Sequence, residues 1–268
     1  MDAFLAQATS DQVGIATQIA ETGLLAESLW INVALAGVTI MAIIALARGV
    51  SSPRAQLIIA ATLFVPVVSL ASYSALISGL TVSLTTLPVG HPSGADPMLT
   101  LWGRYLTWTF STPLILLALG LLAGSNMTKL FMVISADIAM CVTGLAAALT
   151  VSSVALRWGW FAISSVFFVV VLYILLVEWG ADAERAGSAE IFQILRTLTV
   201  VLWIGYPVIW AVGAEGLALI GVIGTSWGYS ILDIGAKYIF ALLLVRWVVA
   251  HERRIGRYTP AKSPVGAD

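Results

Sequence analysis

Seven apolar segments, each long enough to cross a membrane, alternate with short polar breaks along the chain. They cover residues 28–48, 55–80, 100–123, 128–150, 155–179, 189–214 and 222–250. A helix needs about 20 apolar residues to cross a hydrocarbon core about 30 Å thick, whereas a membrane-spanning strand shows alternation over about 10 residues. The pattern therefore predicts an all-α membrane protein built as a bundle of seven transmembrane helices.

The breaks between these segments contain turn-forming and charged residues, as at 49–53, 88–97, 124–128 and 180–187. Residues 1–27 carry four acidic side chains and neither lysine nor arginine, so they lack the basic start of a secretory signal. We expect a polar, partly mobile N-terminal tail at 1–27, a transmembrane domain at 28–254 and a C-terminal tail at 255–268.

The basic residues of the breaks lie mostly on one side of the predicted bundle. That side receives Arg48, Arg54, Lys129, Arg185, Arg253, Arg254, Arg257 and Lys262. The opposite side receives little beyond Arg157. Because short loops rich in lysine and arginine remain in the cytoplasm, the pattern predicts a multi-pass plasma-membrane protein with an extracellular N-terminus and a cytoplasmic C-terminus.

Composition supports this class and excludes others. Of the 268 residues, 60% are hydrophobic and 10% charged, with a mean hydropathy of +0.99, whereas about 25% of residues are charged in soluble domains. A net charge of −1, with no long basic run and no glycine-rich phosphate loop, argues against nucleic acid as a partner. The single cysteine, Cys141, permits neither an intrachain disulfide nor a cysteine metal cluster, and we expect no metal site.

Lys237 stands near the middle of the seventh segment, with Asp233 one helical turn earlier. A charged side chain at bilayer depth costs about 3 kcal/mol or more, so it is tolerated where it faces the protein interior and has a partner. An ionised pair at i and i+4 reduces the cost of burying either charge. Both residues are therefore candidate functional residues.

The third segment carries a polar stripe that could meet this pair. Its members are spaced i, i+3, i+4 and i+7 and share one helical face: Arg104, Thr107, Trp108 and Ser111. Arg104 lies about one turn in from the outer end, and Ser111 lies roughly 10 Å deeper, at a depth similar to that of Lys237. We expect the arginine and the hydroxyl groups to share one buried site with the amine.

Three more segments carry stripes at the same spacing. These are Trp203, Tyr206, Pro207 and Trp210 on the sixth, Asp137, Met140, Cys141 and Gly144 on the fourth, and Trp160, Phe161 and Ser164 on the fifth. A single aromatic stripe more often means helix packing. Several converging around a buried lysine predict a long slot for a flat, apolar ligand. Because a desolvated lysine forms Schiff bases with carbonyl compounds, a conjugated aldehyde would fit.

The charges of such a site leave one positive charge unbalanced. A protonated Schiff base at Lys237, the guanidinium of Arg104 and an ionised Asp233 sum to +1. A small anion held by Arg104, the Schiff-base proton and the hydroxyls of Thr107 and Ser111 would neutralise it, because an uncompensated buried charge is strongly unfavourable.

These residues resemble the microbial rhodopsins and, within that family, the halorhodopsins, over about 28–254. The stretches that carry the resemblance are 28–37, 102–108, 111–113, 136–137, 140–144, 203–207, 232–233 and 236–238. It implies all-trans retinal bound covalently to Lys237 and packed by Trp108, Met140, Gly144, Trp160, Trp203, Tyr206 and Trp210. It also implies Asp233 as the counterion and a chloride ion ligated by Arg104, Thr107 and Ser111.

The implied activity is a light-driven inward chloride or halide pump, an ion transporter rather than an enzyme. Light would isomerise retinal from all-trans to 13-cis and turn the N–H group from the outer to the cytoplasmic side, and the anion would leave past Arg196 and Thr199. Proton-pumping relatives carry aspartate at the positions of Thr107 and Ala118, and neither aspartate is present. The implied partners are membrane lipids and two further copies of the chain in a trimer.

Two other classes of protein remain open. A sensory rhodopsin for phototaxis shares the fold and the retinal lysine and signals through a transducer, but such sensors usually keep an aspartate where Thr107 stands. A light-independent transporter or a ligand-gated receptor is disfavoured, because neither needs a central lysine with aromatic walls.

Among the other polar residues, we expect His91 to be solvated in its loop and Asp137 to be protonated and hydrogen-bonded to Thr112.

Overall fold

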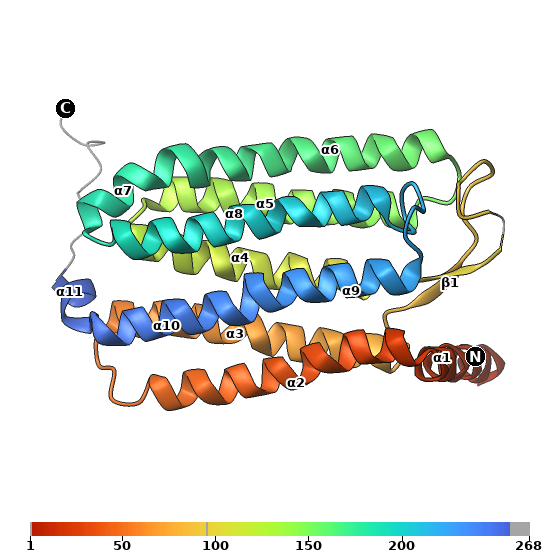
Figure 1. Ribbon diagram of the computed structural model, residues 1–268, viewed down its shortest axis with the longest axis horizontal. Coiled ribbons are helices and arrows are strands. Elements are labelled where there is room, and N and C mark those ends of the chain that lie inside the picture. The colour runs from red at the N-terminus through yellow and green to blue at the C-terminus, as the bar shows by residue number, and fades with distance from the viewer. Residues whose placement is uncertain (1, 95, 258–268) are drawn as a thin grey trace.

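The computed structural model describes residues 2–94 and 96–257. Its elements in chain order are α1 (Asp2–Glu21), α2 (Gly23–Leu46), α3 (Pro53–Ile77), β1 (Ser83–Thr85), β2 (Met98–Thr100), α4 (Gly103–Ala123), α5 (Met127–Leu149), α6 (Val154–Tyr173), the π-helical turn η1 (Ile174–Glu178), α7 (Trp179–Ala186), α8 (Ala189–Val212), α9 (Val222–Asp233), the π-helical turn η2 (Ile234–Ile239), α10 (Phe240–Ala250) and α11 (Glu252–Arg257). Figure 1 shows them as a bundle of long helices lying along one axis.

The seven predicted crossings are confirmed within the described residues, with helix ends close to those expected. The fifth runs from α6 through η1 into α7, and the seventh runs from α9 through η2 into α10. The two π-helical turns widen the helix locally, and η2 contains Lys237. The sequence analysis did not predict these turns, because it assumed regular α-helical spacing along each segment.

Several helix ends follow from local chemistry. Pro53 occupies the first turn of α3, where its missing N–H is not needed. The Asn126 side chain accepts a hydrogen bond from the Lys129 backbone N–H at the start of α5. Gly124 and Gly187, after α4 and α7, adopt left-handed conformations with φ of 70° and 71° that favour glycine. The polar breaks seen in the sequence are therefore real turns.

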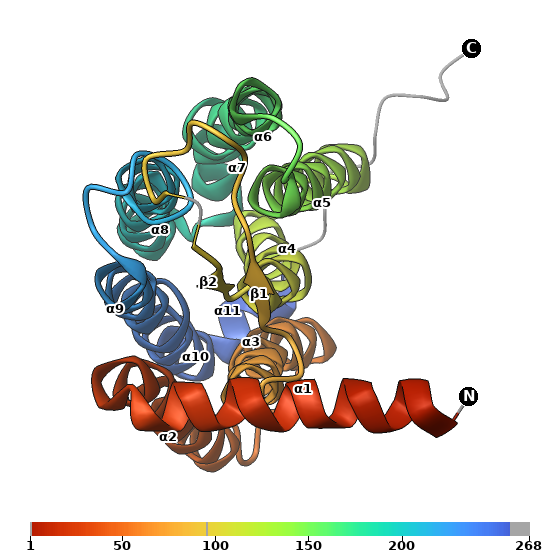
Figure 2. The same cartoon turned by 90° about the vertical axis from the view of Figure 1, so that its right-hand side faces the viewer.

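The N-terminal segment differs from the mobile tail expected for it. Residues 2–21 form α1, which lies across the end of the bundle rather than along it (Figure 2). Ile19 is 1% exposed and packs with Leu25, Tyr73 and Leu76. The segment is too polar to span a membrane, but a few apolar positions are enough to hold it against the bundle. The C-terminal tail expected over 255–268 lies mostly outside the described residues.

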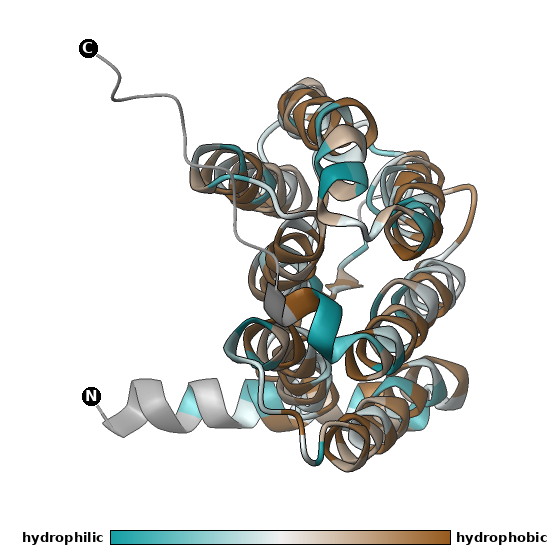
Figure 3. Cartoon of the chain, turned by 90° about the vertical axis from the view of Figure 1, so that its left-hand side faces the viewer, coloured by the Kyte–Doolittle hydropathy of each residue, from teal (hydrophilic) through white to brown (hydrophobic). Residues whose placement is uncertain are grey.

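The α1 end of the bundle also carries a small hairpin. Strands β1 and β2 pair antiparallel, with Leu84 opposite Leu99. The opposite end, here called the α11 end, is polar at α11, while apolar residues dominate the flanks of the bundle (Figure 3). Large side chains such as Val38, Phe131 and Val166 are exposed on those flanks, as expected for a lipid-facing surface.

Most of the buried apolar core lies between the middle of the bundle and the α11 end. Leu119 on α4, Trp179 on α7, Phe192 on α8 and Leu244 on α10 are each 0% exposed. This packed layer closes the α11 side of the bundle. The polar groups described next lie toward the α1 side of it.

Candidate functional site

Lys237 and Asp233 form a buried ion pair in the middle of the seventh crossing. The Lys237 Nζ lies 2.9 Å from Asp233 Oδ2, and the two side chains are 1% and 2% exposed. Asp233 also accepts hydrogen bonds from Tyr73 at 2.7 Å and from Tyr206 at 2.6 Å. Three donors to one carboxylate hold it as a fixed negative charge. The predicted pairing is confirmed.

Arg104, from the first turn of α4, is the second buried cation near this pair. Its guanidinium donates to the Tyr73 hydroxyl at 3.2 Å and to Ser226 Oγ at 2.6 Å, and the residue is 4% exposed. No carboxylate among the described residues lies within ion-pair distance of it. Arg104 therefore reaches Asp233 only through the hydroxyl of Tyr73, and the site holds two cations beside one paired carboxylate.

The two predicted hydroxyl ligands lie on the same buried face of α4. Thr107 is 1% exposed and donates to the Gly103 carbonyl at 3.1 Å, while Ser111 is 0% exposed. The Ser111 hydroxyl has no hydrogen-bond partner. A buried polar group left unsatisfied costs about 1–3 kcal/mol. An acceptor such as a halide would remove that cost, so this residue fits the predicted anion site.

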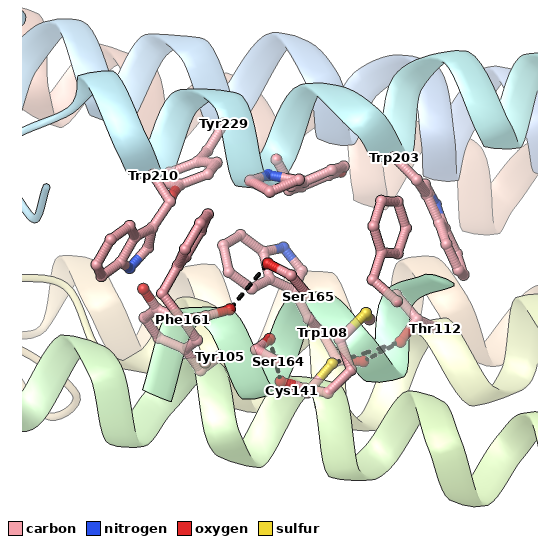
Figure 4. Close-up of a pocket in the computed structure, with 15 residues that line it drawn as sticks. Tyr105, Trp108, Thr112, Cys141, Phe161, Ser164, Ser165, Trp203, Trp210 and Tyr229 are labelled. Carbon is pink, nitrogen blue, oxygen red and sulfur yellow. Dashed lines mark hydrogen bonds between the residues drawn. The ribbon is translucent and has the colours of Figure 1, made fainter. Parts of the chain in front are cut away.

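A cavity lined mainly by aromatic rings lies beside the ion pair (Figure 4). It contains about 690 Å³ of space outside protein atoms, including the part that opens outward. Six of the predicted ligand-packing residues line it: Trp108, Met140, Gly144, Trp203, Tyr206 and Trp210. Tyr206 both lines the cavity and donates to Asp233, which contacts Lys237. Two hydrogen bonds, through Asp233 and Tyr206, thus connect the buried amine with the ring-lined space, whose shape fits a conjugated aldehyde.

Of the two neighbouring aromatic residues predicted to line the slot from the fifth crossing, Trp160 and Phe161, only Phe161 lines the cavity. Trp160 is not among the lining residues and packs against the cluster of Tyr105 and Trp210 at the α1 end. Its neighbour Phe161 lines the cavity and stacks on Trp210, with ring centroids 4.5 Å apart and planes 18° apart. Lys237 is also not a lining residue, so the amine lies outside the ring-lined cavity.

Arg196 and Thr199 lie on α8 toward the α11 end, as expected. Arg196 Nη1 donates to the carbonyl of Leu176, in η1, at 3.3 Å, and the guanidinium lies 6.0 Å from the ring of Phe192. Arg196 Nε and the hydroxyl of Thr199 are buried without a partner. Two unsatisfied donors one turn apart, inside an apolar layer, fit a passage for an anion.

Elsewhere in the bundle, the predicted hydrogen bond from Thr112 to Asp137 is present at 2.6 Å.

The prediction of a solvated His91 is wrong. This side chain is 5% exposed, and its Nε2 lies 3.2 Å from the carbonyl of Glu215, in the loop between α8 and α9. Burial lowers the pKa of His91. The loop bearing His91 folds back over the α1 end because Ser93 also donates to the Ala214 carbonyl at 3.0 Å. Contacts between positions this far apart in sequence leave no local signal.

The sequence analysis missed several further buried polar residues, among them Tyr73, Arg157, Glu215 and Tyr229. Arg157, expected in a surface loop, is 1% exposed and donates to the carbonyls of Ala148 and Glu215. A tyrosine within an apolar segment needs a partner for its hydroxyl, so Tyr73 and Tyr229 could have been flagged. The partners of Tyr73, Asp233 and Arg104, could not have been identified, because they lie on other helices.

The profile of bacteriorhodopsin-like proteins matches residues 24–251. The chain belongs to the bacteriorhodopsin-like family. Its similarity within that family is to halorhodopsins: the halorhodopsin of Halorubrum sodomense is 63% identical over 232 residues, which are 87% of this chain and 82% of that protein. The predicted family and its seven-helix membrane fold are confirmed.

Solved structures of the bacteriorhodopsin-like family also show the similarity to halorhodopsins. One described as halorhodopsin, a light-driven chloride pump, has a TM-score of 0.87 and 55% sequence identity, covering 88% of this chain and 99% of that one. The bromide-bound form of halorhodopsin from Halobacterium salinarum has a TM-score of 0.86 and 55% identity, covering 89% and 99%. The similarity thus extends over nearly the whole of each solved chain.

Proposed function

We propose that this protein is a light-driven inward chloride pump that uses retinal attached to Lys237. The observation that carries the proposal is the charge arrangement around that residue. Two buried cations, Lys237 and Arg104, lie beside a single carboxylate, Asp233, which is fully hydrogen-bonded. Similarity to proteins named halorhodopsin, one described as a light-driven chloride pump, supports the same activity.

The residues of the site suit retinal and a halide together. Retinal, bound to Lys237 as a protonated Schiff base, would supply light absorption and the all-trans to 13-cis isomerisation that switches anion access from outside to cytoplasm. The rings of Trp108, Trp203 and Trp210 would hold the polyene and exclude water from it. Asp233, fixed by Tyr73 and Tyr206, would serve as counterion without moving.

The chloride would bind on the α4 face of the site. Ser111 offers a buried hydroxyl without an acceptor, Thr107 lies one turn nearer the α1 end, and Arg104 supplies the positive charge. No carboxylate stands at position 107 or 118 to take a proton instead. A buried site with excess positive charge is stabilised by an anion and not by a proton.

Transport then requires a route through the apolar layer toward the α11 end. Arg196 and Thr199 offer the next buried donors in that direction. With the α1 end outside and the α11 end in the cytoplasm, as the basic loops indicate, the direction of transport is inward. Membrane lipids would surround the apolar flanks, and we propose a homotrimer by similarity to the family.

Two measurements test the proposal. The purified protein supplied with retinal should be coloured, and its absorption maximum should shift when chloride is added. Illuminated cell vesicles should take up protons passively, and a protonophore should increase that uptake, because inward chloride movement draws protons after it. A colourless product would contradict the retinal site, and a light-driven pH change that the protonophore abolishes would indicate a proton pump. A coloured protein that moves no ion would indicate a sensor.

A further inference from the structure

Arg104 has a second buried partner besides Tyr73, a serine of the seventh crossing. Its Nη2 donates to Ser226 Oγ at 2.6 Å and to the Ser226 carbonyl at 3.4 Å. Ser226, on α9, is 2% exposed, and its Oγ lies 2.6 Å from the Oγ of Ser28, on α2. Ser28 is 0% exposed. Two buried hydroxyl groups thus connect the guanidinium of the predicted anion site with the first crossing.

The direction of these hydrogen bonds follows from the hydrogens available. A serine hydroxyl has one hydrogen to donate and two lone pairs that accept. Ser28 donates its hydrogen to the Leu25 carbonyl, at 2.7 Å. The hydrogen between the two serines therefore comes from Ser226, which accepts from Arg104 with a lone pair. We call these three successive bonds, from Arg104 to Ser226, from Ser226 to Ser28 and from Ser28 to Leu25, the serine link.

The α2 end of the serine link is itself fixed to the seventh crossing. The backbone carbonyl of Ser28 accepts hydrogen bonds from Ser230 Oγ at 2.8 Å and from Asn32 Nδ2 at 3.0 Å. Tyr238, in η2, donates to the Asn32 carbonyl at 3.1 Å. These four residues are at most 3% exposed, so water cannot replace a lost partner. Ser28 therefore presents its hydroxyl to Ser226 from a rigid backbone.

A series of hydrogen bonds donated in one direction suits a cation at its start. Bonds from a charged group are the stronger ones, and each bond in a series polarises the next. On its other side, Arg104 Nη1 donates to the Tyr73 hydroxyl, which donates to Asp233. The guanidinium is thus held from two sides before any anion arrives. A group that is already ordered loses less freedom on binding, which favours affinity.

We propose that Ser28 and Ser226 are positioning residues of the anion site, which hold the Arg104 guanidinium in the orientation that receives chloride beside Thr107 and Ser111. Neither serine contacts the anion in this role, because both act through Arg104. The inference rests on the proposed function, since it adds two residues to the anion site of that pump. It also gives α2 a part in a site to which that helix otherwise contributes no assigned residue.

Chloride titrations of the absorption spectrum and of light-driven transport separate positioning from general packing. Ser226→Ala removes a partner of Arg104 and should raise the chloride concentration at the midpoint of the spectral shift about tenfold, equivalent to about 1.4 kcal/mol. Ser28→Ala leaves Ser226 without its acceptor and should raise the midpoint about threefold, as expected for one hydrogen bond between membrane helices. At saturating chloride both variants should transport at the unsubstituted rate, because the bound anion then holds the guanidinium. Lower saturating rates with unchanged midpoints would mean that the serines only pack the bundle.

The double variant Ser28→Ala/Ser226→Ala tests whether the two serines act along one path. In the serine link, Ser28 affects Arg104 only through Ser226, so the double variant should have the midpoint of Ser226→Ala alone. Independent effects would multiply instead, to about thirtyfold. That outcome would overturn the proposal, as would single variants whose midpoints do not move.

Thr39→Val is the matched control on α2. Thr39 is 3% exposed, and its hydroxyl donates to the Leu35 carbonyl of the same helix at 2.7 Å, outside the serine link. This variant should leave the midpoint unchanged. Ser226→Thr keeps the Oγ and should restore most of the affinity lost in Ser226→Ala, and this pair of variants decides the matter if Ser28→Ala does not fold. The absence of any chloride-induced shift in the unsubstituted protein would instead contradict the proposed pump, so the two failures are distinguishable.

Discussion

The Arg196 guanidinium donates to the carbonyl oxygen of Leu176, 3.3 Å away, across the contact between α8 and the π-helical turn η1. A π-helical turn departs from the regular i to i+4 bonding of its neighbours and is often found at functional sites. Gly180, one turn beyond Leu176, makes room for the same guanidinium: a Cβ there would lie 3.3 Å from Arg196 Nη1. The helical bulge and the glycine together set where Arg196 rests.

Gly180→Ala should therefore shift the Arg196 guanidinium by a few tenths of an ångström, weaken its hydrogen bond to η1 and slow the passage of the anion at the α11 end. A whole hydrogen bond from a charged group contributes about 1.5–3 kcal/mol, so for a weakened one we expect a slowing of up to about tenfold in the decay of the chloride-dependent photocycle intermediates. Time-resolved absorption at several chloride concentrations measures this. Gly159→Ala, in α6, is the control because a Cβ there meets nothing within 4 Å. Equal kinetics in the two variants would argue against a role for this contact.

The ion pair of Lys237 and Asp233 should stabilise the retinal-free protein. Removing one partner of a buried pair costs about 3–5 kcal/mol, because the other charge is left uncompensated. We expect Asp233→Asn to lower the free energy of unfolding of the apoprotein by about this amount, measured by denaturant titration. The double variant Asp233→Asn/Lys237→Met should recover part of the loss. If the double variant loses the sum of both single effects, the pair contributes no coupling energy.

Thr107→Asp should convert the anion site into one that favours a proton. The new carboxylate would lie on the same face of α4 as Arg104 and Ser111 and would balance the positive charge that otherwise recruits chloride. We expect a weaker chloride-induced spectral shift and light-driven proton movement that a protonophore abolishes. Thr107→Val, which removes the hydroxyl without adding charge, separates the two effects. An unchanged chloride shift in Thr107→Asp would contradict the ligand assignment.

Sequence reasoning identified the features that depend on one segment at a time. The seven crossings follow from apolar length, and the pairing of Lys237 with Asp233 follows from i to i+4 spacing on one helix. The shared buried face of Arg104, Thr107 and Ser111 follows in the same way. These patterns need only the geometry of a single helix.

What the sequence could not provide depends on contacts between segments. Tyr73 reaches Asp233 from a helix 160 residues earlier in the chain. His91 and Glu215 meet through two loops 124 residues apart. The π-helical turns and the packing of α1 likewise depend on neighbouring helices. Local periodicity contains no information on such pairings, and charged residues such as Arg157 were therefore assigned to the surface.

His91 should make the loop cover of the α1 end sensitive to pH. Its Nδ1 accepts a hydrogen bond from the Ser93 backbone N–H at 3.1 Å, and its Nε2 donates to the Glu215 carbonyl at 3.2 Å. Only the neutral ring can accept at Nδ1 and donate at Nε2. Burial holds the pKa of His91 below its ordinary value of 6.5. The folded loop therefore binds fewer protons than the open loop between these two pKa values.

The sign of the effect follows from this difference in bound protons. The stabilisation by neutral His91 is present above pH 6.5 and is lost as pH falls through that value toward the lower pKa of the folded loop. We expect amide hydrogen exchange at residues 88–94, corrected for its intrinsic pH dependence, to be faster at about pH 5.5 than at about pH 7.5. His91→Asn keeps an acceptor for Ser93 without a titratable ring and should show equal protection at both pH values. If His91 anchors the loop, its protonation must break the hydrogen bond from Ser93. Equal protection of residues 88–94 at both pH values in the unsubstituted protein would therefore mean that other contacts hold the loop.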